Sequence, residues 1–423
     1  MNRVRTQSSI STMCPRMPSV AWALAVLLVI TVIATQSAPA QTFNLLQTLK
    51  YMNGAESYDN SFVQDGTGNL YSTTPYGALG QCFFGCGIVF KLSPTGKQTV
   101  LYRFTGKKDG GMPHGPMALD AAGNLYGTTI AGGASGTACG GYGCGTLFKV
   151  DKNGKETVLY SFKGGKDGEG PFGGVIRDSA GNLYGTAQNG GAFKSKCGGG
   201  CGTVFKLDTS DKLTVLHTFQ AGTDGEFPIA GLISDGKGNL FGTTSGSGLL
   251  GDGTVFRLTV SGKFTVLHAF SGGQDGQYPS YGTLLLDASG NLYGTTTQGG
   301  GSTHCDGGCG VVYKVDKTGK EIVLHRFAGG ADGATPYSAL VQDPAGNLYS
   351  TTYAGGTGCG SFGCGTVFKL DTAGKKTVLY RFTGGKDGAT PYAELFRDTK
   401  GNLYGTTYGA GAAGLGTIFK LTP

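Results

Sequence analysis

Six of the Asp-Gly dipeptides occupy the same place in successive repeats, and each of these six is followed within a few residues by a proline and a variable side chain. The aspartates are Asp109, Asp167, Asp224, Asp275, Asp332 and Asp387. The ring-bearing residues of this pattern are His114, Phe172, Tyr337 and Tyr392, with Tyr58 in the first copy, which departs from it. Carboxylates accept hydrogen bonds or hold cations, and aromatic side chains line many ligand pockets. Gathered around a channel mouth, the two sets would bind a sugar or a cation, so all are candidate ligand-binding residues.

A simpler explanation applies to each Asp-Gly dipeptide taken alone. Asp and Gly are common turn residues, and a dipeptide that returns six times is most simply a turn. His217, His268 and His325 occupy a strand position that tyrosine holds in other copies. We therefore expect these histidines to pack on an outer strand and not to relay protons.

Catalysis at one centre needs residues that one repeat has and the others lack. The departures of this kind are His114, Glu169, Glu226, Glu394, and His304 with Asp306. No nucleophile with a neighbouring histidine, phosphate-binding loop or zinc-protease motif is present. The sequence favours a binding or structural scaffold for a glycan or an envelope protein, without catalytic residues, metal ligands or a cofactor. The alternative is a metal-dependent hydrolase or lyase acting on a sugar or lactone at a central channel.

A repeat of about 55 residues positions these candidates. Its marker Gly-Asn-Leu-(Tyr/Phe) begins at Gly68, Gly123, Gly181, Gly238, Gly290, Gly346 and Gly401. Each copy holds four short runs rich in Val, Leu, Tyr, Phe and Thr, which is typical of β-strands. Asp-x-x-Gly-Asn and x-x-Gly-Lys segments join them as tight turns, so each copy is predicted to form one antiparallel meander.

The two chain ends predict how the copies assemble. The segment Phe43–Lys50 reads as a lone fourth strand, and Gly416–Leu421 reads as a third strand with no fourth strand after it. The N-terminal segment can therefore complete the last sheet, which closes a ring and which an open solenoid would not need. We predict an all-β fold, a seven-bladed β-propeller with four antiparallel strands per blade, over residues 41–423.

Composition fits this fold and excludes other classes. Glycine contributes 80 of 423 residues but proline only 14, and 39% of residues are apolar, unlike collagen or a disordered chain. Lysines are spread over the repeats instead of forming a basic patch, so we expect no nucleic-acid partner. We expect a monomer.

Residues 1–40 are predicted to be a signal peptide. Arg3, Arg5 and Arg16 precede the apolar run 20–34, and Ala38-Pro39-Ala40 offers a cleavage site. A retained membrane anchor is the alternative, although the run is shorter than the roughly 20 residues that a span needs. This segment holds three arginines and no acidic residue, so without it the net charge falls from +7 to +4. The mature chain is expected to be secreted or periplasmic, without a membrane span.

The ten cysteines outside the signal segment occur as five local pairs, each between the second and third strands of a copy. The pairs are Cys82 with Cys86, Cys139 with Cys144, Cys197 with Cys201, Cys305 with Cys309, and Cys359 with Cys364. Two copies lack both members, as expected for disulfides and not for independent thiols. Each bond would contribute about 2 kcal/mol and implies an oxidising compartment. Zinc binding is the weaker alternative, because each pair supplies only two ligands.

The repeated string Leu-x-x-Asp-x-x-Gly-Asn-Leu-Tyr-Gly-Thr-Thr, followed by Gly-Thr-Val-Phe-Lys-Leu and Thr-Val-Leu-Tyr-x-Phe, resembles the GloVer tandem repeat of exported bacterial proteins. It is also distantly similar to NHL-type propeller repeats. The resemblance covers residues 43–423 and implies an exported β-propeller of no established activity, with no catalytic residues to carry over. Many members end in a surface anchor, whereas this chain ends at Leu421-Thr422-Pro423, so we expect it to be free of covalent surface attachment.

Overall fold

A computed structural model describes most of the chain after residue 40. The described residues are 41–57, 60–78, 82, 85–134, 139–192, 197–279 and 281–423. The predicted signal peptide, residues 1–40, and the candidate Tyr58 lie outside them. Within the described part, no helix has the length and apolar character that a membrane span requires.

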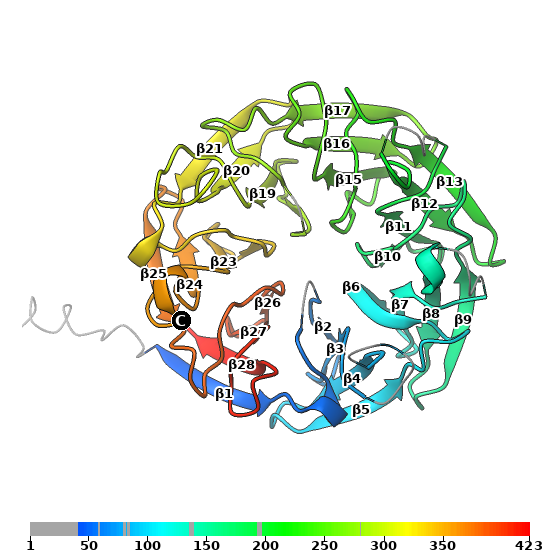
Figure 1. The fold of residues 1–423 in the computed structure, drawn as a ribbon, viewed down its shortest axis with the longest axis horizontal. Coiled ribbons are helices and arrows are strands. Elements are labelled where there is room, and N and C mark those ends of the chain that lie inside the picture. Colours follow the sequence, from blue (N-terminus) through cyan, green and yellow to red (C-terminus); the bar gives the residue numbers. More distant parts are fainter. Residues whose placement is uncertain are drawn as a thin grey trace, which may run out of the picture. The chain divides into compact units, whose positions relative to one another are not determined.

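Seven four-stranded antiparallel sheets follow one another around a closed ring (Figure 1), which confirms the predicted seven-bladed β-propeller. Blade 1 contains β2 (Val63–Gln64), β3 (Leu70–Thr74), β4 (Ile88–Leu92) and β5 (Gln98–Arg103). Blade 2 contains β6 (Gly111–Leu119), β7 (Leu125–Ala131), β8 (Thr146–Val150) and β9 (Glu156–Ser161). Blade 3 contains β10 (Val175–Arg177), β11 (Leu183–Ala187), β12 (Thr203–Leu207) and β13 (Leu213–Thr218). Blade 4 contains β14 (Ile233–Ser234), β15 (Asn239–Thr244), β16 (Thr254–Thr259) and β17 (Phe264–Ala269).

The remaining blades have the same order, with the first strand nearest the ring axis (Figure 1). Blade 5 contains β18 (Leu285–Leu286), β19 (Leu292–Thr296), β20 (Val311–Val315) and β21 (Glu321–Arg326). Blade 6 contains β22 (Val341–Gln342), β23 (Leu348–Thr352), β24 (Thr366–Leu370) and β25 (Lys376–Arg381). Blade 7 contains β26 (Phe396–Arg397), β27 (Leu403–Thr407), β28 (Thr417–Thr422) and the N-terminal strand β1 (Thr42–Thr48). Short 3-10 turns occur at η1 (Tyr51–Asn53), η2 (Cys139–Gly141), η3 (Gly330–Asp332) and η4 (Gly360–Phe362).

The first and last strands close the ring. β1 pairs antiparallel with β28 from Thr42 opposite Thr422 to Thr48 opposite Thr417, and Figure 1 shows the two strands side by side. The Phe43 ring stacks on Tyr380 of blade 6 at a centroid distance of 4.0 Å. The predicted closure is therefore confirmed, and its strand also packs against the neighbouring blade.

The hydrophobic core lies between neighbouring blades. Phe104, which follows β5, and Phe148 in β8 are fully buried or nearly so, with ring centroids 5.0 Å apart. A Cβ atom on Gly127 in β7 would lie 2.6 Å from the Phe148 ring, so the glycine of the Leu-Tyr-Gly-Thr-Thr string makes room for this ring. Each such buried phenylalanine contributes about 1.5–3 kcal/mol.

The Asp-x-x-Gly-Asn segments form the tight turns between first and second strands. In blade 2, Asp120 accepts hydrogen bonds from the backbone N–H groups of Ala122 and Asn124, the Asn124 amide and the Tyr126 hydroxyl. Partial burial alone would raise the pKa of Asp120, but these hydrogen bonds outweigh it and lower the pKa. The pKa of the equivalent aspartate is lowered in every blade.

Acid is therefore expected to destabilise the ring through these turns. A carboxyl whose pKa is lower in the folded than in the unfolded chain stabilises the fold above its unfolded pKa, and this contribution is lost as pH falls through the folded pKa. Replacing Asp120 by alanine should lower the free energy of unfolding by about 1–2 kcal/mol at pH 7 and by less at pH 2. Urea unfolding at both pH values measures this, and an equal loss at both would contradict the carboxylate role.

Candidate functional site

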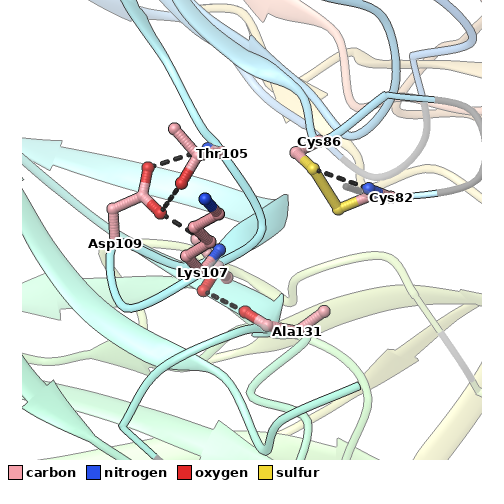
Figure 2. Close-up of a disulfide and its surroundings, with 7 residues drawn as sticks. Cys82, Cys86, Thr105, Lys107, Asp109 and Ala131 are labelled. Atoms are coloured by element: carbon pink, nitrogen blue, oxygen red, sulfur yellow. Dashed lines mark hydrogen bonds between the residues drawn. A yellow bond between two sulfur atoms is a disulfide. The ribbon is translucent and has the colours of Figure 1, made fainter. Parts of the chain in front are cut away.

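The six candidate aspartates lie at the outer edge of the ring. Asp109 accepts hydrogen bonds from the Thr105 backbone and hydroxyl and from the Lys107 backbone (Figure 2), and from the hydroxyl of Tyr102 in the outermost strand, β5, at 3.0 Å. The other five aspartates meet the side chains of Tyr160, His217, His268, His325 and Tyr380, at 3.0 to 3.5 Å. Each aspartate thus fastens the crossing between two blades to an outer strand.

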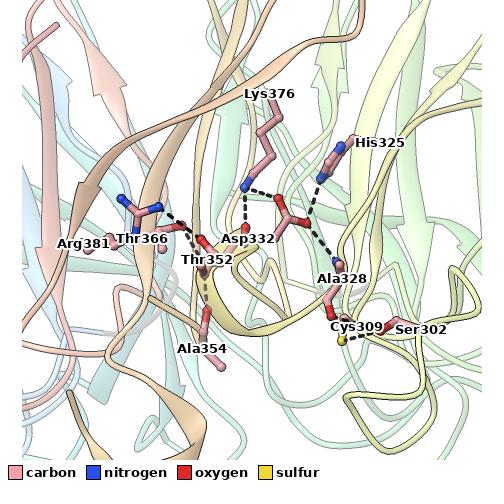
Figure 3. Close-up of polar contacts among 11 residues, drawn as sticks. Ser302, Cys309, His325, Ala328, Asp332, Thr352, Ala354, Thr366, Lys376 and Arg381 are labelled. Atoms are coloured by element: carbon pink, nitrogen blue, oxygen red, sulfur yellow. Dashed lines mark hydrogen bonds and ion pairs between the residues drawn. The ribbon is translucent and has the colours of Figure 1, made fainter. Parts of the chain in front are cut away.

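The histidines expected on the outer strands are found there. His217 stacks on Phe264 of the next blade at a centroid distance of 3.9 Å. His325 pairs with Asp332, which also receives the Lys376 ammonium of blade 6 at 2.9 Å (Figure 3). These contacts fasten neighbouring blades, as the packing interpretation anticipated.

The aromatic candidates lie nearer the ring axis and form two groups. Tyr337 and Tyr392 stack at 4.3 Å, and Tyr281 meets both edge-on at 5.4 Å. On the other side of the ring, His114 lies 4.9 Å from Phe172. Burial lowers the pKa of His114 to about 3, so its imidazole is neutral at physiological pH. Among the described residues, the candidate aspartates and the candidate aromatics therefore lie in separate parts of the ring.

Tyr281 is not among the sequence-predicted candidates, because blade 5 has one more residue between its proline, Pro279, and its turn aspartate, Asp287, than the other blades that carry this proline. Counting back six residues from the turn aspartate gives a ring-bearing side chain in five blades, whereas blade 1 has Asp59 and blade 4 has Ile229 there. The five are His114, Phe172, Tyr281, Tyr337 and Tyr392. This register, and not the proline, is the signal that identifies the aromatic position.

The residues two positions after this aromatic position approach one another and narrow the centre of the ring. We call this constriction the throat, and it is formed by Pro116, Gly174, Gly231, Thr283 and Glu394. A Cβ atom on Gly231 would lie 2.7 Å from the Thr283 hydroxyl and 3.4 Å from Pro116. A carboxylate oxygen of Glu394 in blade 7 accepts the backbone N–H of Thr283 in blade 5 at 2.8 Å. This hydrogen bond joins two blades that are not neighbours, since blade 6 lies between them.

Below the throat lies a cavity of about 380 Å³, which we call the central cavity. Its walls come from the inner strands of blades 5, 6 and 7 and include Leu285, Val341 and Phe396, while Thr283 and Glu394 stand where the chain enters those strands. It extends to Gln342 and Arg397, beside the tight turns, on the side away from the tyrosines.

A second cavity, of about 510 Å³, lies on the face that carries the disulfide loops. We call it the loop pocket. Tyr76, Lys107, Lys108, Met112 and Tyr142 line it together with glycine, alanine and cysteine residues, and none of the described residues that line it is acidic. The Tyr142 side chain is 79% exposed. Two adjacent lysines occur in this interblade crossing and in no other, so the loop pocket has the asymmetry that a specific site requires.

Five disulfides hold the loops around this face, which confirms the predicted pairs. The second cysteine of each pair also ties its blade to the next one: the Cys86 carbonyl accepts the Met112 N–H at 2.8 Å, and the Cys364 carbonyl accepts the Thr390 N–H at 2.8 Å. Gly106 packs directly over the Cys82–Cys86 bond, where a Cβ atom would lie 2.6 Å from sulfur.

One disulfide also has a carboxylate beside it. An oxygen of Glu226 and the sulfurs of Cys197 and Cys201 lie within 4.8 Å of one another. Because these two sulfurs are bonded to each other, they do not offer the thiolates that a zinc site uses.

Known structures of similar fold include enzymes. Virginiamycin B lyase from Staphylococcus aureus aligns over 90% of this chain and 99% of its own length, at 12% identity and a TM-score of 0.57. A fungal alcohol oxidase, solved in complex with copper, aligns over 89% of this chain and 76% of its own length, at 16% identity and a TM-score of 0.54. At these identities the likeness extends to the fold alone. A comparison with curated proteins finds no match.

The sequence itself is more informative about relatives. The model of the Gloeobacter/Verrucomicrobia repeat matches residues 31–232, 136–358 and 302–423, three overlapping stretches that include every blade. The repeat strings and the fold agree with this match. The chain therefore belongs to the Gloeobacter/Verrucomicrobia repeat family.

Proposed function

We propose that this protein is an exported binding scaffold whose loop pocket binds an anionic carbohydrate. The observation that carries the proposal is the composition of that pocket: the exposed Tyr142, Tyr76 and two lysines, with no acidic side chain among the described lining residues. An aromatic face packs on the C–H face of a sugar ring, and ammonium groups pair with carboxylates or sulfates on it.

The surrounding structure favours binding by a preformed surface. The Gly133 N–H donates to the Lys107 carbonyl at 2.8 Å, and the Gly132 N–H donates to the Tyr142 carbonyl at 2.7 Å. These bonds hold the crossing and the disulfide loop of the pocket in place, so less conformational freedom is lost on binding. Lys107 and Lys108 make no ion pair among the described residues, so their charges are available to a ligand.

The cellular location fits the same proposal. Five disulfides are stable in an oxidising compartment, and the family fits an extracellular or periplasmic protein. Cell-wall and matrix polysaccharides are the carbohydrates found there, and those that carry uronic acids match the charge of the pocket. The signal peptide remains a prediction, as does the monomeric state.

Replacing Tyr142 by alanine is expected to weaken binding of oligogalacturonate about five- to thirtyfold, since the loss of one aromatic contact costs about 1–2 kcal/mol. Calorimetric titration measures the effect. Phe362→Ala is the matched control: Phe362 holds the same loop position in blade 6, is also 79% exposed, and does not line the pocket. This control should bind like the unmodified protein.

A second experiment tests whether binding requires the lysine charges and a charged ligand. Lys107→Gln with Lys108→Gln should abolish the salt dependence of binding, and neutral galacto-oligosaccharides should bind weakly to every variant. Equal affinity for charged and neutral oligosaccharides, or an unaffected Tyr142→Ala variant, would overturn the proposal. Binding of isolated envelope protein at the loop face with no glycan binding would favour the other ligand class.

The metal-dependent enzyme is not our proposal. Among the described residues that line the central cavity, Glu394 is the only carboxylate, and no histidine or cysteine accompanies it. A catalytic zinc site uses about three protein ligands.

A further inference from the structure

The central cavity is polar at both ends and apolar between them, with Ser61, Thr283 and Glu394 on the throat side and Gln342 and Arg397 at the other end. Glu394 is 7% exposed and stands at the throat end, whereas leucine, valine and phenylalanine side chains contribute much of the wall. The same ring position holds Ser61, Pro116, Gly174, Gly231, Thr283 and Ala339 in the other blades, so the acid is unique to blade 7. Repeat architecture does not require it.

The polar groups at this end are incompletely satisfied. One oxygen of Glu394 accepts the Thr283 N–H, and Glu394 makes no ion pair within the described part of the chain. The Thr283 hydroxyl is buried beside this carboxylate and has no other hydrogen-bond partner there. A buried acid without a cation is costly, and a ligand that carries one would relieve that cost.

The positively charged side chain in the cavity wall, Arg397, points away from Glu394. Arg397 also lines the cavity, but a Cβ atom on Gly401 would lie 3.3 Å from its guanidinium, which places that group at the β26–β27 turn. Burial and then Asp343 raise the pKa of Tyr349 in blade 6 to about 12, and the Arg397 charge partly opposes this rise, so the guanidinium acts on that neighbouring tyrosine. Glu394 is therefore left to meet a cation from outside the chain.

We propose that the central cavity binds a small aliphatic primary amine, whose ammonium group donates to Glu394 and Thr283 and whose alkyl chain lies along the inner strands. An ammonium has three N–H donors and no acceptor, so it satisfies the carboxylate and the hydroxyl oxygen together. The cavity volume of about 380 Å³ lies within the range of small-molecule sites. The site is separate from the loop pocket, so either proposal can fail without the other.

Proton exchange gives this binding a specific signature. Burial raises the pKa of Glu394, while the hydrogen bonds from Thr283 lower it by less. An incoming ammonium favours the ionised carboxylate, so binding to the protonated carboxyl should release a proton. A neutral alcohol would leave the carboxyl protonated and would release none.

Titration of the full folded protein with n-butylamine, and with n-butanol as the uncharged match, tests the proposal. We expect the amine to bind, with a heat that varies with the ionisation enthalpy of the buffer, and the alcohol to bind at least tenfold more weakly. Glu394→Gln should lose at least tenfold in amine affinity, and Glu169→Gln, which changes a carboxylate outside this cavity, should lose nothing.

Thr283→Val keeps the backbone donor to Glu394 and removes the hydroxyl, so it tests the site if Glu394→Gln does not fold. We expect this variant to bind the amine several-fold more weakly. The absence of amine binding, equal binding of amine and alcohol, or unchanged affinity in both variants would each overturn the proposal and leave Glu394 as a structural tie between blades 5 and 7.

Discussion

Replacing Leu49 by alanine is expected to lower the free energy of unfolding by about 3 kcal/mol, because this side chain fills the seam where the ring closes. Leu49 is fully buried just after β1 and packs in one cluster with Phe62 and Phe90 of blade 1 and Ile418 of blade 7. Its backbone N–H also donates to the Gly416 carbonyl at 3.0 Å. Denaturant unfolding measures the loss.

Leu45→Ala is the matched control in the same segment. Leu45 lies in β1 and pairs with Phe419, but its side chain is 40% exposed, so the same truncation should cost less than about 1 kcal/mol. Proteolysis near residues 41–50 should accelerate in the Leu49 variant and not in the control. Equal costs for the two variants would show that the seam contributes no more than an ordinary exposed strand.

The ring closure could be predicted because it depends on the order of strands along the chain and not on side-chain detail. The N-terminus supplies a fourth strand without a sheet and the C-terminus supplies a sheet without a fourth strand, so pairing the two closes the ring. The meander within each blade could be predicted equally well, since Asp120 and Asn124 form a tight turn from local residues alone. Local chemistry and chain order therefore account for the architecture.

The placement of the candidate aspartates could not be predicted in the same way. An Asp-Gly in a crossing loop can face the axis or the outer edge, and its direction depends on how the crossing packs on the blade. The sequence did contain one unused signal: a Tyr or His stands seven residues before each of these aspartates, as Tyr102 does before Asp109. In the structure these two side chains bond to each other.

Contacts between blades that are not neighbours were even harder to predict from the sequence. Glu394 stood out in the sequence as a departure from the repeat, but Thr283 is 111 residues away from it. Their hydrogen bond depends on how deeply blades 5 and 7 reach toward the axis, and repeat spacing does not specify that depth. The loop pocket likewise depends on two loops from neighbouring blades, so its lining could not be read from one repeat.

One position at the start of the outer strand shows how charge decides the fit between blades. Lys376 of blade 6 pairs there with Asp332 of the preceding crossing at 2.9 Å. At the same position blade 2 has Glu156, which faces Asp109, and blade 5 has Glu321, which faces Asp275. One carboxylate oxygen of each glutamate is buried without a partner among the described residues.

The two glutamates should make stability fall as pH rises from about 5 to 8. Burial and then the facing aspartate raise the pKa of Glu156 to about 7, and the same causes, partly offset by Arg326, raise that of Glu321 to about 7. A carboxyl whose pKa is higher in the folded than in the unfolded chain stabilises the fold below its unfolded pKa. That contribution is lost as pH rises through 7. Because both side chains are only partly buried, we expect about 1 kcal/mol from each.

Replacing both glutamates by glutamine should therefore stabilise the protein by about 2 kcal/mol at pH 8 and flatten the dependence between pH 5 and 8. Glu321→Lys goes further, because it recreates opposite Asp275 the pairing that Lys376 makes with Asp332 (Figure 3). Its stability at pH 8 should exceed that of Glu321→Gln, and high salt should reduce the difference. Thermal unfolding across this pH range measures all of these effects. A flat profile for the unmodified protein would contradict the proposed repulsion, since a carboxyl that titrates alike in folded and unfolded chains cannot change stability with pH.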